Sequence, residues 1–277
     1  MSVLDEPKID GHCHVLDPEP FPYAPDTAYR PAGQEMGTLH ALRAVMDCYH
    51  VQHALLVGPN SGYGLDNRCM LNAIATSGGR FKGIAVVPND TGEERLLELK
   101  SQGVVGVAFN AALMGLDYYA NLLPLLKRLA KLEMWAQFQV EGDQLVSLRP
   151  MMEQGGARIL IDHCGRPILK HGVQQAGFQA LLEMGRLKQA VVKLSGQAKY
   201  SQAGYPFADV RPYIEQLFQT FGPAHCIWAS DWPYLKAPYR LDFGPMLRLM
   251  EQGFSASERR AVMWDTPARL FGFAAAA

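Results

Sequence analysis

A few widely separated residues in this sequence have side chains that can move protons or bind a metal ion. His12 and His14 are separated by one residue, His163 lies past the middle of the chain, and Asp231 lies in its last fifth. Imidazoles and carboxylates act as general acids and bases near neutral pH, and both are ligands of catalytic zinc. A carboxylate beside imidazoles can therefore activate water, provided that the fold brings such distant residues together.

Short apolar runs precede these polar residues and mark the elements that position them. Several runs, such as HALLVG, KGIAVV and CIWAS, are continuously apolar, which is typical of parallel strands covered on both faces. The predicted strands are residues 9–14, 54–57, 83–87, 104–109, 135–140, 158–161, 191–194 and 226–229.

Helix-length segments with apolar residues at helical spacing lie between or after these runs. The predicted helices are residues 39–50, 65–77, 92–103, 118–133, 143–156, 173–187, 206–218 and 255–273. Eight strands alternating with eight helices predict an α/β fold, a single (β/α)8 TIM barrel over residues 1–277. Such a barrel typically needs about 250 residues. Ser255 and Glu258 have the spacing of a capping box at the start of the last helix.

In such a barrel, the active site is built at the carboxyl ends of the strands. His12 and His14 end the first strand on one face, since side chains alternate along a strand. His163 follows the sixth strand and Asp231 the eighth. A lone histidine pair is more often a core feature, and a lone aspartate is more often a helix cap. The shared position of all four favours a catalytic role for each.

Residues 16–38 form the longest stretch without a predicted element, directly after the first strand. Long irregular loops are usually lids or binding loops. We expect this loop to lie over the mouth of the active site, although it could simply cap the barrel.

Composition excludes several classes of protein. With 48% apolar residues and a net charge of −1, the chain resembles neither a disordered protein nor a nucleic-acid or polybasic membrane binder. Five dispersed cysteines without a CxxC pair indicate reduced thiols rather than a disulfide scaffold, and the first residues do not resemble a signal peptide. We therefore expect a cytoplasmic protein that binds a small molecule, as a monomer or homodimer.

Three motifs carry a resemblance to a known family. IDGHCHV, IDHCGRP and WASDWPY resemble the amidohydrolase superfamily (amidohydrolase family 2), and in particular its lactone hydrolases of the 2-pyrone-4,6-dicarboxylate lactonase type. RFKGIAVV, VGVAFN, GLDN and DTPARLFGF extend the similarity over nearly the whole chain. The resemblance implies a hydrolase acting on carboxylic ester bonds, in sugar-acid or aromatic catabolism. It assigns Asp231 as the general base, and His12, His14 and His163 as groups that bind or polarise the carbonyl.

The resemblance implies no obligatory cofactor. Binuclear members also use a lysine or glutamate on a middle strand and a histidine on the fifth strand, which this sequence lacks. A single divalent ion such as zinc could be held by His12, His14 and Asp231, because catalytic zinc needs three protein ligands and an open position. We expect turnover without a required metal.

The substrate is expected to carry little negative charge. Dicarboxylate lactonases of this type have an arginine in the fourth strand where this chain has Ala108. A bidentate arginine contributes much to carboxylate recognition and is not easily replaced. We therefore predict a neutral or monoanionic lactone.

Seven further residues are predicted substrate contacts. Tyr29 and Lys199 match substrate contacts of relatives, and Ser195 is read as a pocket donor rather than a nucleophile. Arg166 could bind an anion or pair with Asp162 as a structural clasp, and the clasp is favoured. The substrate-binding set is Tyr29, Asn60, Asn110, Gln139, Arg166, Ser195 and Lys199.

Two rival functions remain open at this point. A zinc-dependent decarboxylase of the same superfamily would bind its metal tightly and release carbon dioxide without opening a ring. A lactone isomerase, or a barrel retained only for binding, would release no acid.

Overall fold

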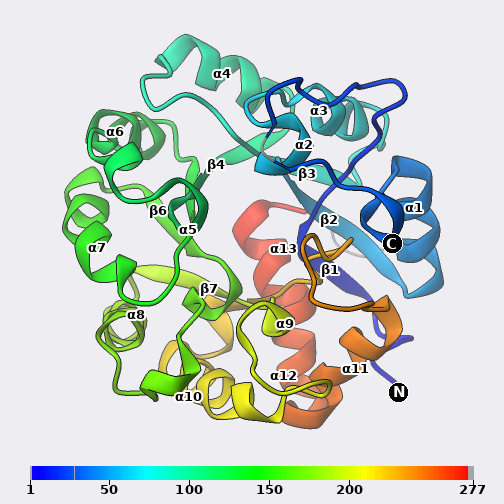
Figure 1. Cartoon of the computed structure of the whole chain (residues 1–277), viewed down its shortest axis with the longest axis vertical. Coiled ribbons are helices and arrows are strands. Elements are labelled where there is room, and N and C mark those ends of the chain that lie inside the picture. Colours follow the sequence, from blue (N-terminus) through cyan, green and yellow to red (C-terminus); the bar gives the residue numbers. More distant parts are fainter. Residues whose placement is uncertain (1, 28, 274–277) are drawn as a thin grey trace. The chain divides into compact units, whose positions relative to one another are not determined.

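The computed structural model describes residues 2–27 and 29–273, and within them eight strands alternate with helices (Figure 1). The strands follow one another in a single sheet in the order β1 to β8, and the neighbours whose register is defined are parallel. This is the predicted (β/α)8 TIM-barrel fold. The strands are β1 Lys8–Cys13, β2 Val51–Val57, β3 Phe81–Ala85, β4 Val104–Asn110, β5 Trp135–Gln139, β6 Arg158–Ile161, β7 Ala190–Leu194 and β8 Cys226–Trp228.

All eight strand predictions are confirmed, with shifts at the ends. β6 has the predicted bounds, whereas β2 begins three residues earlier than predicted, at Val51. Gln52 and His53 in this part of β2 are polar and only partly buried, so the fully apolar part of the pattern starts at Ala54.

The predicted helices are present with shifted ends. The helix predicted over 206–218 begins at Arg211, the helix predicted over 255–273 is divided by a π-helical turn at Ala261–Asp265, and one longer helix is an addition. The longer helices are α1 Leu39–Cys48, α3 Arg68–Ala75, α4 Glu93–Ser101, α6 Leu123–Lys131, α7 Gln144–Gly155, α8 Ala176–Arg186, α10 Arg211–Phe221, α11 Phe243–Gly253, α12 Ala256–Arg260 and α13 Thr266–Phe271. Single turns form α2 Asn60–Tyr63, α5 Ala111–Met114 and α9 Gln197–Tyr200. Helix α11 was not predicted, because Gly244 and Pro245 at its start are typical of a turn. It buries Phe243, Leu247 and Met250 at helical spacing.

The chain divides into two compact units, and the sites below are described within each. The first comprises Met1–Val86, Ser101–Val105 and Trp228–Ala277, and the second comprises Val87–Lys100 and Gly106–Ile227. The first therefore holds β1, β2 and β3, and the second holds β5, β6 and β7. The assignment of residues 1–277 to one domain stays a prediction.

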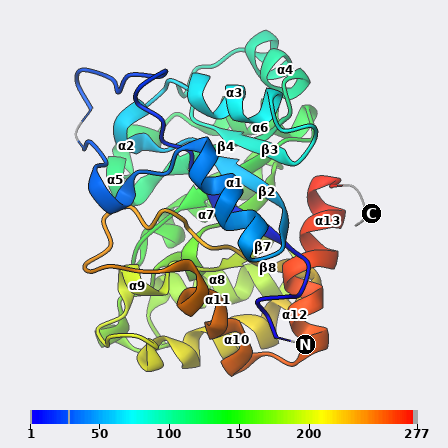
Figure 2. The ribbon, with the colours of Figure 1, turned by 90° about the vertical axis from the view of Figure 1, so that its right-hand side faces the viewer.

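In the first unit, the chain start is fixed to the helices that end the barrel. Arg259 of α12 pairs with Glu6 and also donates to the carbonyl of Phe254. Figure 2 shows the N-terminal segment beside α12. Ser255 and Glu258 form the predicted capping box at the start of α12. These contacts fix the segment that leads into β1 against α12.

In the second unit, proline determines where one helix begins. The predicted helix 118–133 instead starts at Leu123, with Pro124 in its first turn and a separate 3-10 turn at Asp117–Tyr119. Proline is tolerated in a first turn because the amide hydrogen that it lacks has no partner there. Pro150 is accommodated inside α7.

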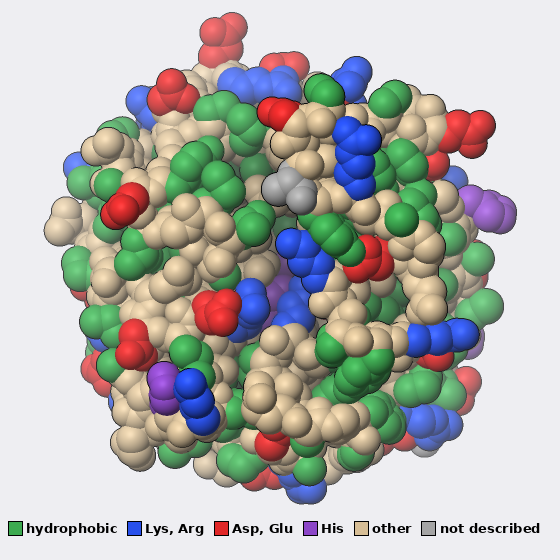
Figure 3. Space-filling view, viewed as in Figure 1, with side chains coloured by type: hydrophobic (Ala, Val, Ile, Leu, Met, Phe, Trp, Pro, Cys, Tyr) green, Lys and Arg blue, Asp and Glu red, His purple; other side chains and the backbone are tan. Residues whose placement is uncertain are grey.

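The surface fits the nearly neutral composition. On the face drawn in Figure 3, basic and acidic side chains are interspersed, and neither sign forms an extended patch. None of the helices in residues 2–27 and 29–273 combines the length and apolar composition needed to cross a bilayer.

Candidate active site

Two histidines at the end of β1 lie in direct contact. The ring centroids of His12 and His14 are 4.9 Å apart with the ring planes at 84°, an edge-to-face arrangement. Both side chains are buried, His12 at 2% and His14 at 7% exposure. The alternation of side chains along β1 therefore places the two imidazoles together, as the sequence predicted.

The hydrogen bonding of His14 fixes which of its nitrogens faces the site. Its Nδ1 lies 2.7 Å from the carbonyl oxygen of Val57, at the end of β2. A carbonyl only accepts, so Nδ1 carries the proton and donates to it. In the neutral ring Nε2 then offers a lone pair, and in the imidazolium form it offers a second donor. Histidines that bind metals are commonly oriented through their other nitrogen in this way.

Asp231 faces both imidazoles. Its Oδ1 lies 3.9 Å from Nε2 of His12 and 3.9 Å from Nε2 of His14, and the residue is 2% exposed. The backbone of Asp231 has a left-handed φ of 62°, a conformation that costs a non-glycine residue about 1–2 kcal/mol. Its backbone N–H donates to the carbonyl of His12, 2.8 Å away. The turn after β8 is thus fixed on the end of β1.

A second aspartate, which the sequence reasoning did not single out, supports this turn. Asp10 is buried in β1, and its Oδ1 accepts from the backbone N–H of His12 at 3.0 Å and of Ser230 at 2.9 Å. Its Oδ2 accepts from the Ser230 hydroxyl, which in turn accepts from the Trp232 N–H at 2.9 Å. Asp10 stands two residues before His12, and that spacing on a strand was the available signal.

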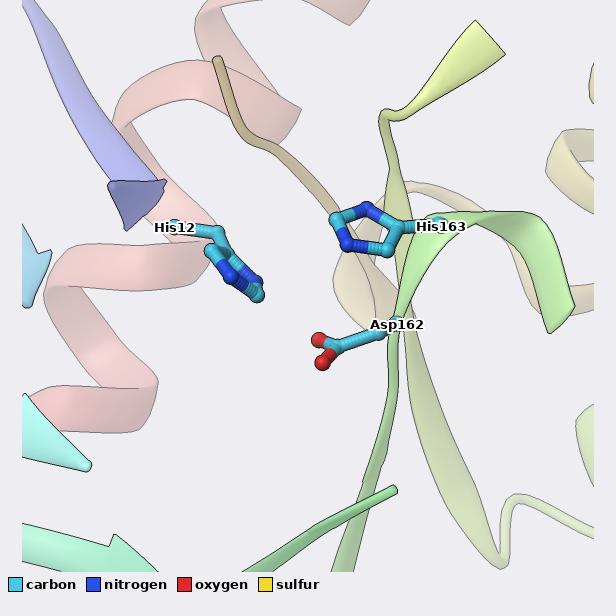
Figure 4. Close-up of side chains that lie close together, drawn as sticks. All are labelled: His12, Asp162 and His163. Carbon is cyan, nitrogen blue, oxygen red and sulfur yellow. The ribbon is translucent and has the colours of Figure 1, made fainter. Parts of the chain in front are cut away.

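In the second unit, His163 is the second residue after the end of β6 (Figure 4). Its side chain is fully buried. Its Nδ1 lies 2.9 Å from Oγ of Ser195, which follows β7. Gly196 makes room for this ring, because a Cβ at that position would lie 2.7 Å from Cγ of His163. The Ser195 hydroxyl thus contacts His163, and the proposed role of Ser195 as a substrate donor stays a prediction.

Three buried polar side chains, from β5, from β7 and from the residue after β6, bond to one another. Lys193 of β7 lies 3.1 Å from Oδ1 of Asp162 and donates to Oε1 of Gln137, 2.7 Å away, in β5. Gln137 donates to Oδ2 of Asp162 at 2.9 Å. We call these three residues the Lys193 triad. Sequence reasoning missed Gln137 and Lys193, because polar residues within an apolar run can be read from the sequence but their partners cannot.

The favoured clasp between Arg166 and Asp162 is wrong. Arg166 pairs instead with Glu141, with 3.2 Å between its Nη2 and Oε2, while Asp162 bonds to Lys193. The backbone explains the difference. Residues 163–166 all have left-handed φ values, between 43° and 71°, so the turn directs Arg166 toward the loop after β5.

The predicted substrate contacts occupy varied positions. Asn110 caps α5, its side-chain oxygen accepting from the Leu113 N–H at 3.1 Å. Asn60 begins α2, Gln139 ends β5 and Lys199 lies in α9, and all three are partly buried. Their contact with a substrate stays a prediction.

Tyr29, in the loop after β1, is tied to a neighbouring carboxylate. Its hydroxyl donates to Glu35, and the ammonium of Lys236 lies 4.7 Å from the centre of its ring. Glu35 also accepts from the backbone N–H of Lys236 at 2.6 Å. Burial and the hydrogen bond to Glu35 raise the pKa of Tyr29 to about 12. The hydroxyl is therefore protonated at neutral pH. Through the bond between Glu35 and Lys236, the loop after β1 is joined to the loop after β8.

The donor set in the first unit fits one divalent ion. Nitrogens of His12 and His14 and a carboxylate oxygen of Asp231 all lie within 4.8 Å of one another. His14 is already oriented by Val57, as a ligand would be. Three protein ligands with an open position are what catalytic zinc requires.

Comparison with known proteins identifies the family. The model of the family described as Amidohydrolase matches residues 9–273. The chain is 29% identical to a 2-pyrone-4,6-dicarboxylate hydrolase of Comamonas testosteroni, over 95% of this chain and 89% of that protein. It is also 29% identical to a 4-sulfomuconolactone hydrolase of Rhizobium radiobacter, with the same coverage. A crystal structure of a Pseudomonas putida protein provisionally named 2-pyrone-4,6-dicarboxylic acid hydrolase superposes with a TM-score of 0.86 and 29% identity, covering 98% of this chain and 99% of that one.

Proposed function

The chain belongs to the amidohydrolase family, and from that premise we propose that it opens a lactone of at most one negative charge by adding water to its ester carbonyl. Its relatives along nearly the whole chain are named lactone hydrolases, which act on carboxylic ester bonds. The observation that carries the proposal is the buried Asp231 carboxylate, 3.9 Å from two imidazole nitrogens.

In this proposal Asp231 is the general base. It takes a proton from a water molecule whose oxygen attacks the lactone carbonyl, forming a tetrahedral oxyanion. The ring C–O bond then breaks, the leaving alkoxide takes back a proton, and the product is a hydroxy acid. Each step conserves the atoms of one lactone and one water. A positioned base of this kind contributes roughly 10²–10⁴-fold to the rate.

The histidines stabilise the oxyanion. Because Nδ1 of His14 donates to Val57, its Nε2 carries a proton only in the imidazolium form, so His14 would act as a cationic donor. His12 is the second donor from β1, and the proposal assigns His163 to the same reaction. Buried donors aimed at a developing oxyanion are worth more than the same groups in water.

Turnover is proposed not to require a metal. His12, His14 and Asp231 fit a single divalent ion, which when bound would polarise the carbonyl as a Lewis acid. An ester is a better electrophile than an amide and needs less activation. Chelator-treated enzyme is therefore expected to keep its full kcat, with metal content measured on the same sample. Loss of activity that returns on adding zinc would overturn metal independence and leave lactone hydrolysis standing.

The charge of the substrate follows from β4. Ala108 is partly exposed where the dicarboxylate lactonases of the family carry an arginine, and Asn110 caps α5. No guanidinium of β4 is thus available to a second carboxylate.

A panel of lactones tests both the reaction and the substrate class. It comprises neutral sugar lactones, monoanionic muconolactone-type lactones and 2-pyrone-4,6-dicarboxylate, with acid release followed by a pH indicator. We expect the highest kcat/KM on a neutral or monoanionic member. Preference for the dicarboxylate would overturn the charge assignment. Substrate conversion without acid release would indicate isomerisation, and release of carbon dioxide would indicate decarboxylation.

A further inference from the structure

We propose that the Lys193 triad is a positioning device that sets the imidazole of His163 for the reaction. The inference rests on the proposed function, since it concerns one of the residues assigned to that reaction. Lys193, Asp162 and Gln137 are 0%, 2% and 0% exposed, so none of them meets bulk solvent. We treat them as positioning residues that act through His163, because Asp162 directly precedes His163 in the chain and bonds to Lys193 and Gln137.

The place of the triad in the sheet connects it to His163. The last register pair of β6 and β7 is Ile161 with Val192, and the next residues along are Asp162 and Lys193. Beyond the last backbone pair, the side chains of Asp162 and Lys193 therefore link β6 to β7 through their ion pair. One residue further along β6 and two along β7, His163 contacts Ser195. The Asp162–Lys193 bond and the His163–Ser195 bond are thus successive links between the same two strand ends.

The turn that carries His163 needs such support. The four residues of this turn have left-handed φ values, which residues other than glycine avoid. The values are 50°, 56°, 71° and 43° for His163, Cys164, Gly165 and Arg166. A strained backbone persists only where its surroundings hold it in place. Figure 4 shows the Asp162 carboxylate and the His163 ring projecting to the same side from the end of β6.

Lys193 contacts the residues on either side of His163, namely Asp162 and Cys164. Its ammonium bonds to the Asp162 carboxylate, and its backbone carbonyl accepts from the Cys164 thiol at 3.7 Å. Within the turn itself, the Gly165 N–H donates to the Asp162 carbonyl at 2.9 Å. A shift of Asp162 therefore shifts the backbone of His163, which follows it directly in the chain. A displacement of about 1 Å in a catalytic group can lower the rate 10²-fold.

The alternative is that the triad only stabilises the fold. Buried ionic groups can often be replaced by apolar residues of similar volume without loss of stability. The triple variant Gln137→Met, Asp162→Leu, Lys193→Met makes that replacement, and it separates the two roles. The double variant Glu6→Leu, Arg259→Met is the matched control, since this ion pair is also largely buried but belongs to the first unit.

Two measurements decide the matter. Nitrogen-15 NMR of the imidazoles, with His163 assigned through His163→Gln, reports the environment of that ring whether or not a lactone is turned over. We expect the His163 signals to move in the folded triple variant and to stay in place in the Glu6→Leu, Arg259→Met control. On the best lactone of the panel, kcat should fall about 10²-fold with KM nearly unchanged.

Unchanged His163 signals in a folded triple variant would overturn the positioning role. Moved signals together with a wild-type enzyme that opens no lactone would support the positioning and reject the proposed function. If the triple variant does not fold, Gln137→Met removes only the neutral member, and the same shift of the His163 signals is expected from it.

Discussion

At the scale of single residues, two groups to which the proposed function assigns chemistry are held in unusual backbone conformations. Asp231 and His163 both have left-handed φ values, 62° and 50°. Each is fixed by neighbours, Asp231 through the Asp10–Ser230 bonds and His163 through Ser195. Strain of this kind is concentrated at functional sites, where the surrounding structure holds a side chain in one position.

Asp231→Asn tests the general base directly. The amide cannot accept a proton, so we expect kcat to fall by about 10²–10⁴-fold while the unfolding midpoint stays near that of the wild type. Steady-state kinetics and urea unfolding measure the two. Asp242→Asn is the control, because Asp242 is an exposed carboxylate of the following loop that pairs with Arg240. A fully active Asp231→Asn enzyme would refute the mechanism.

Gly196→Ala tests the space beside His163. Gly196 has φ 70°, and an added Cβ would lie 2.7 Å from Cγ of His163, so the ring must shift. We expect a lower kcat in addition to a stability loss of about 1 kcal/mol from the left-handed backbone. Gly156→Ala has the same φ of 70° but its nearest neighbour is 3.9 Å away. It should lose the stability alone, and equal kcat values in the two variants would contradict the prediction.

At the scale of elements, loops that follow different strands are fixed to one another within the first unit. Glu35, in the loop after β1, accepts from Tyr29 and from the backbone of Lys236, in the loop after β8. Gly37 packs tightly on Trp232, since an added Cβ would lie 2.8 Å from that ring. The loop predicted as a lid is thus held against the segment that carries Asp231.

Glu35→Ala should loosen this loop. It removes the acceptor of the Tyr29 hydroxyl, so the pKa of Tyr29 is expected to fall from about 12 toward its ordinary value of 10.0, as followed by absorbance titration of tyrosinate. If the loop acts as a lid, KM for the lactone rises more than kcat falls. Glu19→Ala, an exposed carboxylate of the same loop, is the control. An unchanged KM would argue that the loop only caps the barrel.

At the scale of the whole chain, the barrel depends on non-covalent packing. All five cysteines are free thiols, four of them buried and only Cys48 exposed. Burial raises the pKa of the Cys69 thiol and raises that of Cys164 to about 11, which keeps both in the unreactive form.

Thiol counting tests this arrangement. A coloured disulfide reagent should modify one thiol rapidly in the native protein, Cys48, and all five after denaturation. A reducing agent should leave the unfolding temperature unchanged. Rapid modification of several thiols under native conditions would show that the barrel opens far more readily than its buried core indicates. Cys48→Ser should abolish the rapid phase.

The sequence alone determined the fold and the residues proposed for chemistry. Apolar runs at regular intervals are enough to fix a parallel α/β barrel, because burial on both faces leaves a pattern that can be read locally. The ends of those runs then indicated His12, His14, His163 and Asp231. The sequence did not predict helix α11, because Gly244 and Pro245 at its start are typical of a turn.

Only the tertiary structure decided which polar groups bond to one another. The partner of Asp162 is Lys193 and not Arg166, and the support of Asp231 comes from Asp10. These pairs join residues that are far apart in the sequence, through a left-handed turn or a strand end. The sequence cannot predict them, because the direction of a side chain there depends on backbone angles that long-range packing sets.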